Sequence, residues 1–371
     1  ISSARTDDPG AFRISSLLPG NYVVAVASSQ TTMPLAMFEE TARQGGVRDE
    51  VMSAIPEFQI RGYSQNQQIG NVVLMTRSGI AWPPAPDDSG RLSVYPTTFH
   101  PSTTSAAEAT VLSLGAGEER SGVTIQVRPV PAARVSGTLI GPNGPVPLAA
   151  LRLSPTGQIA DVALDPVTGL SDESGAFTLL GVPPGQYVLR VMTPQIAGAQ
   201  RPPSTPEKPI LWASEPVTVG DSDVSGLTVQ LRPTFRVAGR VGFLGSKPGP
   251  SGQALREYVN GISVSSAVAG WGGAMTAVDA NGAFETGVAG GSYLVTAEDF
   301  PDWSLKAVMF EGRDISDVPV EIKGNVSGIV VQYADSVSQI AGTVRNAQGA
   351  PDSSVFVVVS PADRERWTSP A

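Results

Sequence analysis

A turn-and-strand motif that occurs three times constrains this chain more than any other feature. Its clearest copy is DESGAFTLLGVPPGQYVLRV at residues 172–191, with weaker copies at 7–26 (DDPGAFRISSLLPGNYVVAV) and 279–295 (DANGAFETGVAGGSYLV). The opening Asp-x-x-Gly favours a turn, because the Asp side chain caps a backbone N–H and Gly adopts a positive φ. Apolar residues then alternate on both sides of a second turn, which is strand periodicity. Each copy is therefore predicted to be a β-hairpin, and the chain to be a repeat protein.

Two further markers set the frame of the repeat. A strand that begins Ser-Gly recurs at 121–128, 225–232 and 327–333, and a strand with the pattern V/I-x-G-x-V/L recurs at 135–139, 237–241 and 340–344. Both recur at a spacing of about 100 residues, which is the size of a single β-sandwich. The predicted fold class is therefore all-β. We expect complete sandwiches at 132–234 and 235–335, a partial one at 1–131, and the first strands of another at 336–371.

The partial N-terminal unit carries an insertion at about 27–90, which is far longer than an ordinary loop. Residues 37–44, after Pro34, are predicted to form a short helix, and residues 81–90 an extended loop. The small polar stretch 102–109 is predicted to be a loop or a single turn. Such insertions decorate a surface or carry a binding site.

Composition limits the partners. The net charge is −9 with no basic block, which argues against nucleic acid and anionic membranes. No apolar run is long enough to span a membrane. The chain has no cysteine, so disulfides and thiol chemistry are excluded, as suits an exported protein that packing alone stabilises. We expect a secreted or cell-surface location.

The two ends hold complementary parts of one repeat. Residues 1–26 contain the motif without the V/I-x-G-x-V/L strand that precedes it elsewhere, and residues 340–360 contain that strand without the motif. A half-sandwich leaves strand edges and an apolar face unpaired. A second copy of the chain would complete it as a head-to-tail filament. The same chain could instead close a ring, or the sequence could cut a longer tandem array in mid-unit. The expected interface residues are Phe12, Ile14, Tyr22, Val24, Val26, Ile340, Val344, Val355, Val357 and Val359.

The pattern D-x-x-G-x-F…P-G-x-Y, with its preceding V-x-G-x-V strand, resembles the carboxypeptidase regulatory-like domain over nearly the whole chain. This resemblance implies transthyretin-like (prealbumin-like) β-sandwiches, also grouped with carbohydrate-binding-like folds, in an elongated array. It implies an accessory module without peptidase chemistry, in an exported bacterial protein. The motif is also similar to the Cna B-type domains of surface adhesins and pili. Their Lys–Asn isopeptide bond is not expected here, because none of the four lysines lies in the first strand of a unit.

No residues suggest a catalytic or metal site. His100 is the only histidine, and neither the G-x-S-x-G pattern of a nucleophilic serine nor the usual ligands of zinc accompany it. The pairs Asp7/Asp8, Asp87/Asp88 and Asp221/Asp223 could offer oxygen ligands to calcium. No D-x-D-x-D-G loop contains them, so turn capping is the preferred interpretation. We therefore expect no cofactor, no metal and no enzymatic activity.

Sugars remain possible partners. The five tryptophans are spread one to a region, which favours core packing over a sugar-stacking platform. Asn325-Val-Ser327 matches a glycosylation sequon, and residues 97–105 and 202–209 are rich in Ser, Thr and Pro, as O-glycosylated segments are. The preferred hypothesis is a structural subunit of an extracellular filament whose partners are copies of itself. The alternative is a carbohydrate-binding or adhesive module array of a larger envelope protein, with a polysaccharide as partner.

Overall fold

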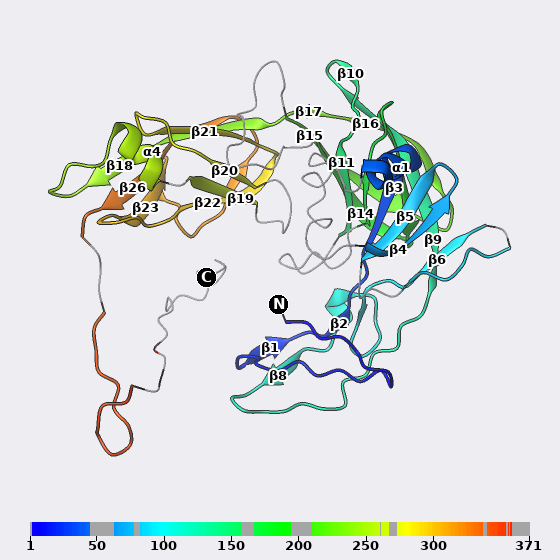
Figure 1. Ribbon diagram of the computed structural model, residues 1–371, viewed down its shortest axis with the longest axis horizontal. Coiled ribbons are helices and arrows are strands. Elements are labelled where there is room, and N and C mark those ends of the chain that lie inside the picture. The colour runs from blue at the N-terminus through cyan, green and yellow to red at the C-terminus, as the bar shows by residue number, and fades with distance from the viewer. Residues whose placement is uncertain are drawn as a thin grey trace. The chain divides into compact units, whose positions relative to one another are not determined.

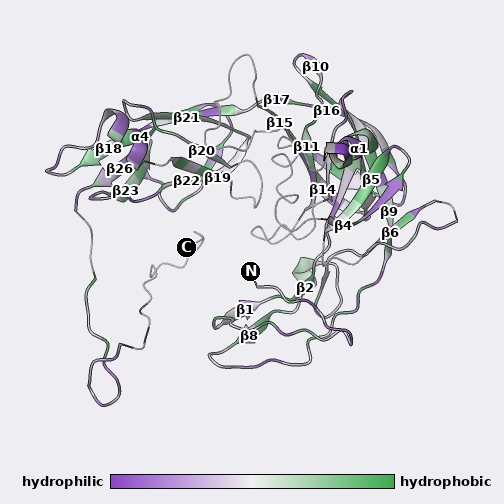
Figure 2. Cartoon of the chain, in the orientation of Figure 1, coloured by the Kyte–Doolittle hydropathy of each residue, from purple (hydrophilic) through white to green (hydrophobic). Residues whose placement is uncertain are grey.

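The computed structural model describes residues 2–44, 63–77, 82–88, 90–156, 167–193, 210–259, 261–266, 273–336, 340–353, 355 and 357. The chain divides into two compact units (Figure 1). The first consists of Ile1–Gly198 and Pro209–Pro233, and the second of Ala199–Lys208 and Thr234–Ala371. Both are built mainly from β-strands, as expected of an all-β chain, and hydrophobic (green) and hydrophilic (purple) stretches both occur along these strands in Figure 2.

The first unit contains a two-sheet sandwich. One sheet is centred on β9 (Val130–Gly141), which pairs with β6 (Leu92–Val94), β10 (Gly144–Pro145), β13 (Ala176–Val182) and β16 (Val224–Gln230). The other has the order β17 (Arg232–Pro233), β15 (Leu211–Val219), β14 (Gly185–Met192), β11 (Ala150–Pro155), β12 (Val167–Leu170), β3 (Gln30–Pro34), β5 (Val72–Arg77) and β4 (Tyr63–Ile69). The core between the sheets includes Val135, Leu139, Phe177 and Leu189. Two short pairs lie outside the sandwich, β1 (Gly20–Tyr22) with β8 (Leu112–Leu114) and β2 (Ala25–Val26) with β7 (Thr98–Phe99).

The second unit repeats this arrangement without the added strands. One sheet has the order β21 (Ala283–Val288), β18 (Phe235–Leu244), β26 (Val326–Ala334), β23 (Ser304–Phe310) and β24 (Arg313–Asp314). The other has the order β20 (Ala274–Thr276), β19 (Ile262–Ser266), β22 (Gly291–Ala297) and β25 (Val320–Ile322), and α4 (Gly252–Tyr258) precedes β19. The core is rich in aromatic residues, and burial raises the pKa of Tyr293 and of Tyr333 to about 12.

The two strands of the repeated motif do not form a hairpin, and that prediction is wrong. β13 pairs with β9 in one sheet, whereas β14 pairs with β11 and β15 in the other, and β21 and β22 are separated in the same way. Both strands of a copy alternate apolar residues toward one core, with Phe177 and Leu189 buried from opposite sides. Crossing between the sheets buries both apolar faces at once, which a flat hairpin would not do. The motif is therefore an arch that joins the two sheets.

The predicted Asp turn is confirmed. Asp172 Oδ1 accepts hydrogen bonds from the backbone N–H groups of Ser174 (2.8 Å) and Ala176 (3.0 Å), and Gly175 has a φ of 78°. The same bond from the residue four positions on, with a glycine at a φ of 80–82°, recurs at Asp7, Asp87, Asp279 and Asn346. The turn thus occurs at two places beyond the three copies of the motif.

Removing the carboxylate tests this turn. We expect Asp172→Ala to lower the free energy of unfolding of the first unit by about 1–2 kcal/mol, because the N–H groups of Ser174 and Ala176 lose their acceptor. Chemical denaturation measures the difference. Asp172→Asn is the matched control, because Asn346 forms the same turn with an amide oxygen. Equal destabilisation by both substitutions would contradict this account.

The strands of the other two sequence markers lie side by side, and a glycine in each is needed for their contact. Gly226, in the Ser-Gly marker of β16, has a φ of 71° and forms a bulge where the register with β9 shifts. The bulge brings the Leu227 carbonyl oxygen to 2.2 Å from where a Cβ on Gly137 would lie. In the second unit Gly328 has a φ of 87°, and the Ile329 oxygen would lie 2.3 Å from a Cβ on Gly239. The V/I-x-G-x-V/L strand therefore requires glycine wherever a Ser-Gly strand lies beside it.

The insertion at about 27–90 adds structure to the first sandwich. α1 (Leu35–Gln44) confirms the predicted helix and packs its Met37 on the same cluster as Met33 and Leu170. β3 runs parallel to β12, and the hydroxyls of Thr31 and Thr168 hydrogen-bond at 2.7 Å. Residues 82–88 and 90 form no helix or strand, as expected, and the stretch 102–109 holds the single 3-10 turn Ala106–Glu108. The insertion thus extends a sheet of the sandwich instead of forming only loops.

Candidate assembly segments and a polar pocket

The expected interface residues are largely exposed. The exposed fraction is 38% for Phe12, 84% for Ile340 and 39% for Val344, and Val26, Val355 and Val357 are also exposed. Ile14, Tyr22 and Val24 are half-buried, and Val359 lies outside the described residues. Residues 11–18 and 340–344 form no strand in this structure. Both segments therefore carry apolar side chains that the chain leaves in contact with water.

The equivalent residues of the complete sandwiches are buried. Val135 and Leu139 in β9, and Val237 in β18, occupy the positions of Ile340 and Val344 and are 0% exposed. Phe177 and Phe284 occupy the position of Phe12 and are 3% exposed. The same sequence positions are therefore core wherever the complementary strand is present, and exposed in the two end segments.

The contact between a bulged carbonyl and the central glycine of the neighbouring strand is not made by the described residues of these segments. Gly122, in the first Ser-Gly marker, has a φ of 78°, as a bulge requires. Gly342 is the central glycine of the 340–344 marker. Among the described residues, no atom lies within 4 Å of a Cβ built on either glycine, whereas Gly137 and Gly239 each face a backbone carbonyl. A glycine with the φ of a bulge and a glycine able to receive a bulged carbonyl are thus both present, and neither makes such a contact with the described residues.

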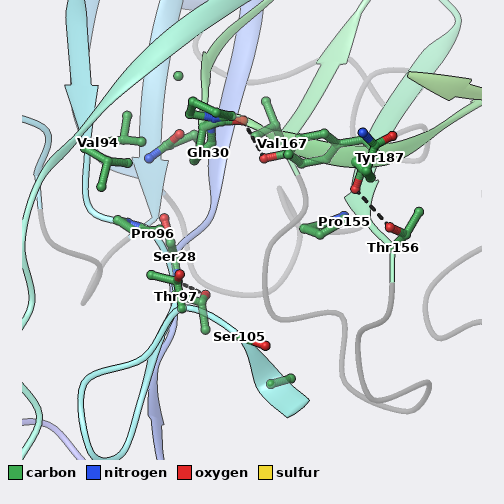
Figure 3. A pocket seen from close by; sticks show the side chains of 18 of the residues that line it. Ser28, Gln30, Val94, Pro96, Thr97, Ser105, Pro155, Thr156, Val167 and Tyr187 are labelled. Carbon is green, nitrogen blue, oxygen red and sulfur yellow. Dashed lines mark hydrogen bonds between the residues drawn. The ribbon is translucent and has the colours of Figure 1, made fainter. Parts of the chain in front are cut away.

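A pocket of about 580 Å³ lies within the first unit. Its walls come from the arch between β13 and β14, the start of β3, the stretch 94–107, the start of β9, the ends of β11 and β12 around Thr156 and Val167, and Asp221. Figure 3 shows Gln30 between Val94 and Tyr187 at this site. The inserted strand β3 and the arch of the repeat therefore form the pocket together.

Gln30 is a largely buried polar residue of the pocket lining. Its exposed fraction is 3%, yet within the described part of the chain no hydrogen bond reaches its side-chain amide. A β-bulge between Leu179 and Val182 makes room for it. At this bulge Gly181 has a φ of 73°, and a Cβ there would lie 2.5 Å from Gln30 Oε1. The bulge thus leaves an amide that faces the pocket without a hydrogen bond to the described residues.

Apart from Asp221, the remaining polar groups of the pocket are neutral, and several of them are held in place by hydrogen bonds. The Ser28 N–H donates to Thr97 Oγ1 at 2.8 Å, and the Tyr187 hydroxyl donates to the Pro183 carbonyl at 2.7 Å (Figure 3). The Gln186 side-chain oxygen accepts a hydrogen bond from Thr218 at 2.8 Å. The lining contains no Lys, Arg or His, and Asp221 is its one carboxylate. The pocket is therefore suited to an uncharged, hydrogen-bonding ligand.

The other candidate residues have structural roles. His100 Nδ1 lies 2.9 Å from the Thr124 carbonyl oxygen. The preferred interpretation of the Asp pairs holds for Asp7 and Asp87, which cap turns. Asp223 accepts the Arg134 N–H at 2.8 Å, and at the equivalent position Asn325 accepts the Arg236 N–H at 2.9 Å. Asn325 is exposed, and its glycosylation stays a prediction.

Trp212 and Trp303 are buried, as core packing predicts, and Trp82 is half-buried. Trp271 and Trp367 lie outside the described residues. No cluster of three or more potential metal ligands occurs in the part of the chain that the structure describes. None of the helices described is long and apolar enough to cross a membrane.

Comparisons with known proteins give only distant structural matches. No protein-family model matches the chain, and no curated protein matches its sequence. Among solved structures, a streptococcal ancillary pilin is 10% identical, with a TM-score of 0.23 over 83% of this chain and 98% of its own. A minor pilin of Streptococcus agalactiae is 10% identical, with a TM-score of 0.25 over 57% of this chain and 100% of its own. A shaft pilin from Lactobacillus rhamnosus GG is 10% identical, with a TM-score of 0.20 over 56% of this chain and 100% of its own. Matches at this level support no conclusion about function.

The pocket was not predicted from the sequence, although two signals for it are present. The spacing from Phe177 to Tyr187 is one residue longer than that from Phe284 to Tyr293, and the extra residue is accommodated at the bulge. The run Ser-Ser-Gln-Thr-Thr at 28–32 is polar, yet all five residues are buried. A buried polar strand facing a bulge marks the site.

Proposed function

We propose that the chain is a non-enzymatic structural subunit of a secreted or cell-surface filament, in which copies join head to tail by completing a β-sandwich. One observation carries this proposal. Ile340 and Val344 are exposed while their equivalents in both complete sandwiches are buried. No described atom lies within 4 Å of a Cβ on Gly342, whereas Gly137 and Gly239 each face a backbone carbonyl.

The complete sandwiches define how the ends would join. β9 lies between an antiparallel arch strand, β13, and a parallel Ser-Gly strand, β16. By analogy, residues 340–344 of one copy would insert between residues 11–18 and 121–128 of the next. The bulge at Gly122 would then direct the Val123 carbonyl at Gly342, and Phe12 would enter the shared core.

The free energy gained by burying the exposed apolar side chains is comparable to the free-energy cost of association. Burial of a large apolar side chain contributes about 1.5–3 kcal/mol, and six such side chains of the expected interface are exposed in the free chain. Association costs roughly 4–15 kcal/mol in lost freedom. Completing the sandwich also pairs the backbone N–H and C=O groups of both segments, so the gain offsets the cost.

The resemblance to carboxypeptidase regulatory-like modules supports an exported protein. Membership of that family remains a prediction. The alternative function, a carbohydrate-binding or adhesive array, predicts an exposed aromatic platform. Tyr258 is 49% exposed but stacks on Phe300 with ring centroids 5.9 Å apart. Such packing within the unit favours a structural role for this ring.

Assembly is tested by electron microscopy and by sedimentation over a range of protein concentrations. We expect filaments, and we expect Phe12→Ala to weaken association by about 3 kcal/mol, because it truncates a side chain that assembly buries. Leu244→Ala, at a residue of similar exposure (39%) in the second unit, is the control and should assemble normally. Unchanged assembly of Phe12→Ala would overturn the proposal. Monomers that stay single at every concentration would favour a ring or a longer tandem array.

A further inference from the structure

The pocket in the first unit has no part in the assembly described above. It combines a buried amide, several hydroxyl groups and apolar ring faces, and it carries no positive charge. We propose that it is a binding site for one or two residues of an uncharged saccharide, with Gln30 as the recognition group. This proposal goes beyond the filament function and does not depend on it.

The state of Gln30 points to a ligand. Burying an amide without hydrogen bonds is unfavourable, and native proteins seldom do so. Gln30 is 3% exposed and lines a cavity, and its amide makes no such bond to the described residues. The amide is not among the fully enclosed unpartnered atoms of the described residues, which are Ser29 Oγ and Thr76 Oγ1, so its hydrogen bonds depend on what occupies the cavity. An amide offers a donor and an acceptor side by side, and so does a pair of neighbouring sugar hydroxyls. A saccharide could therefore satisfy both halves of this group at once.

The rest of the lining narrows the class of ligand. Phosphate and carboxylate ligands call for Arg or Lys, and the lining contains neither. Pro183, Pro184 and the ring of Tyr187 supply apolar surface, against which the C–H face of a sugar ring can pack. The volume of about 580 Å³ falls in the range of small-molecule sites. A neutral ligand with a polar rim and apolar faces fits these features.

A peptide fits less well. Peptides that add to a sheet need a strand edge with free N–H and C=O groups. β3 pairs with β12 and β5 on its two sides, and β14 pairs with β11 and β15. The recognition groups that these two strands offer are therefore side chains, which favours a saccharide over an extended peptide.

The test uses the full chain, labelled with ¹⁵N, and four neutral disaccharides at millimolar concentration: maltose, cellobiose, lactose and N,N′-diacetylchitobiose. We expect at least one of them to shift the side-chain NH₂ signals of Gln30 in a saturable way. Gln30→Leu should weaken that binding about tenfold, as expected for one lost buried hydrogen-bonding group. Gln230→Leu, at an exposed residue of β16 outside the lining, is the matched control and should bind normally.

A second variant tests the proposal independently in case Gln30→Leu does not fold. Ser105 lines the pocket, and its side chain makes no capping hydrogen bond to the 3-10 turn. Ser105→Trp should therefore fill the pocket and abolish binding while the sandwich stays folded. Failure of all four sugars to bind the wild-type chain would overturn the proposal, and so would binding that Ser105→Trp leaves intact. Saturation of the Gln30 signals by a polyserine peptide, and not by the sugars, would assign the pocket to a polypeptide instead.

Discussion

Replacing Gly342 with alanine is expected to abolish assembly and to leave both sandwiches folded. In the free chain a Cβ at this position meets no described atom within 4 Å, so the substitution costs nothing there. In the completed sandwich it would meet a carbonyl oxygen, as a Cβ on Gly137 or Gly239 would at 2.2 and 2.3 Å. A contact that short forces strands apart, so we expect association to weaken by at least about 100-fold.

Sedimentation and electron microscopy measure this effect, and circular dichroism checks the fold. Gly324→Ala is the matched control, because a Cβ on Gly324 also meets no described atom within 4 Å and this residue lies outside the expected interface. Filaments formed by Gly342→Ala at the wild-type concentration would show that residues 340–344 do not enter a sandwich in the manner of β9. A loss of assembly in both variants would point to a general effect of the added methyl group.

The second large effect is expected within a single unit. Gly239→Ala should destabilise the second sandwich by about 3 kcal/mol or more, because its Cβ would lie 2.3 Å from the Ile329 oxygen and 2.5 Å from the Phe284 ring. The bulge at Gly328 and the buried ring leave little room for adjustment. The expected result is loss of hydrogen-exchange protection in β18 and β26, with β9 and β16 in the first unit unchanged.

Gly242→Ala provides the comparison on the same strand. A Cβ on Gly242 would meet only a methyl group of Val330 at 3.6 Å, an ordinary contact. Alanine also restricts the unfolded chain more than glycine does, so the effect should stay within about 1 kcal/mol and could be stabilising. If the two substitutions destabilise the sandwich equally, the fit of the bulge is not what requires glycine at position 239.

The turn and the two strands of the repeated motif could be predicted from the sequence, but the pairing of those strands could not. The Asp turn is local, since one side chain and one glycine three positions apart define it, and it was predicted correctly. The alternation of Phe177, Leu179, Tyr187 and Leu189 likewise predicted two strands. Alternation does not say which strand each one pairs with, and a hairpin and an arch have the same periodicity. The need to bury both faces in one core separated the two strands into different sheets.

The pocket depends on contacts between distant residues. Gln30 and Gly181 are 151 positions apart, and only the parallel pairing of β3 with β12 brings Gln30 beside the bulge at Gly181. No local signal predicts that a strand from an insertion will join the edge of another sheet. The helix α1 could be predicted because its signal is local, whereas the place where it packs could not.

The sequence by itself determined the all-β class, the repeat, the Asp turns and most strands of the two complete sandwiches, whereas residues 121–128 and 340–344, also predicted to be strands, form none in this structure. Turn chemistry and alternation act over a few residues, so they can be recognised without the fold. Only the tertiary structure decided that the arch joins two sheets, that inserted strands extend one of them, and that the glycine of the V/I-x-G-x-V/L strand receives a bulged carbonyl. These features depend on which surfaces meet, and burial of a shared core settles that choice over the whole chain at once.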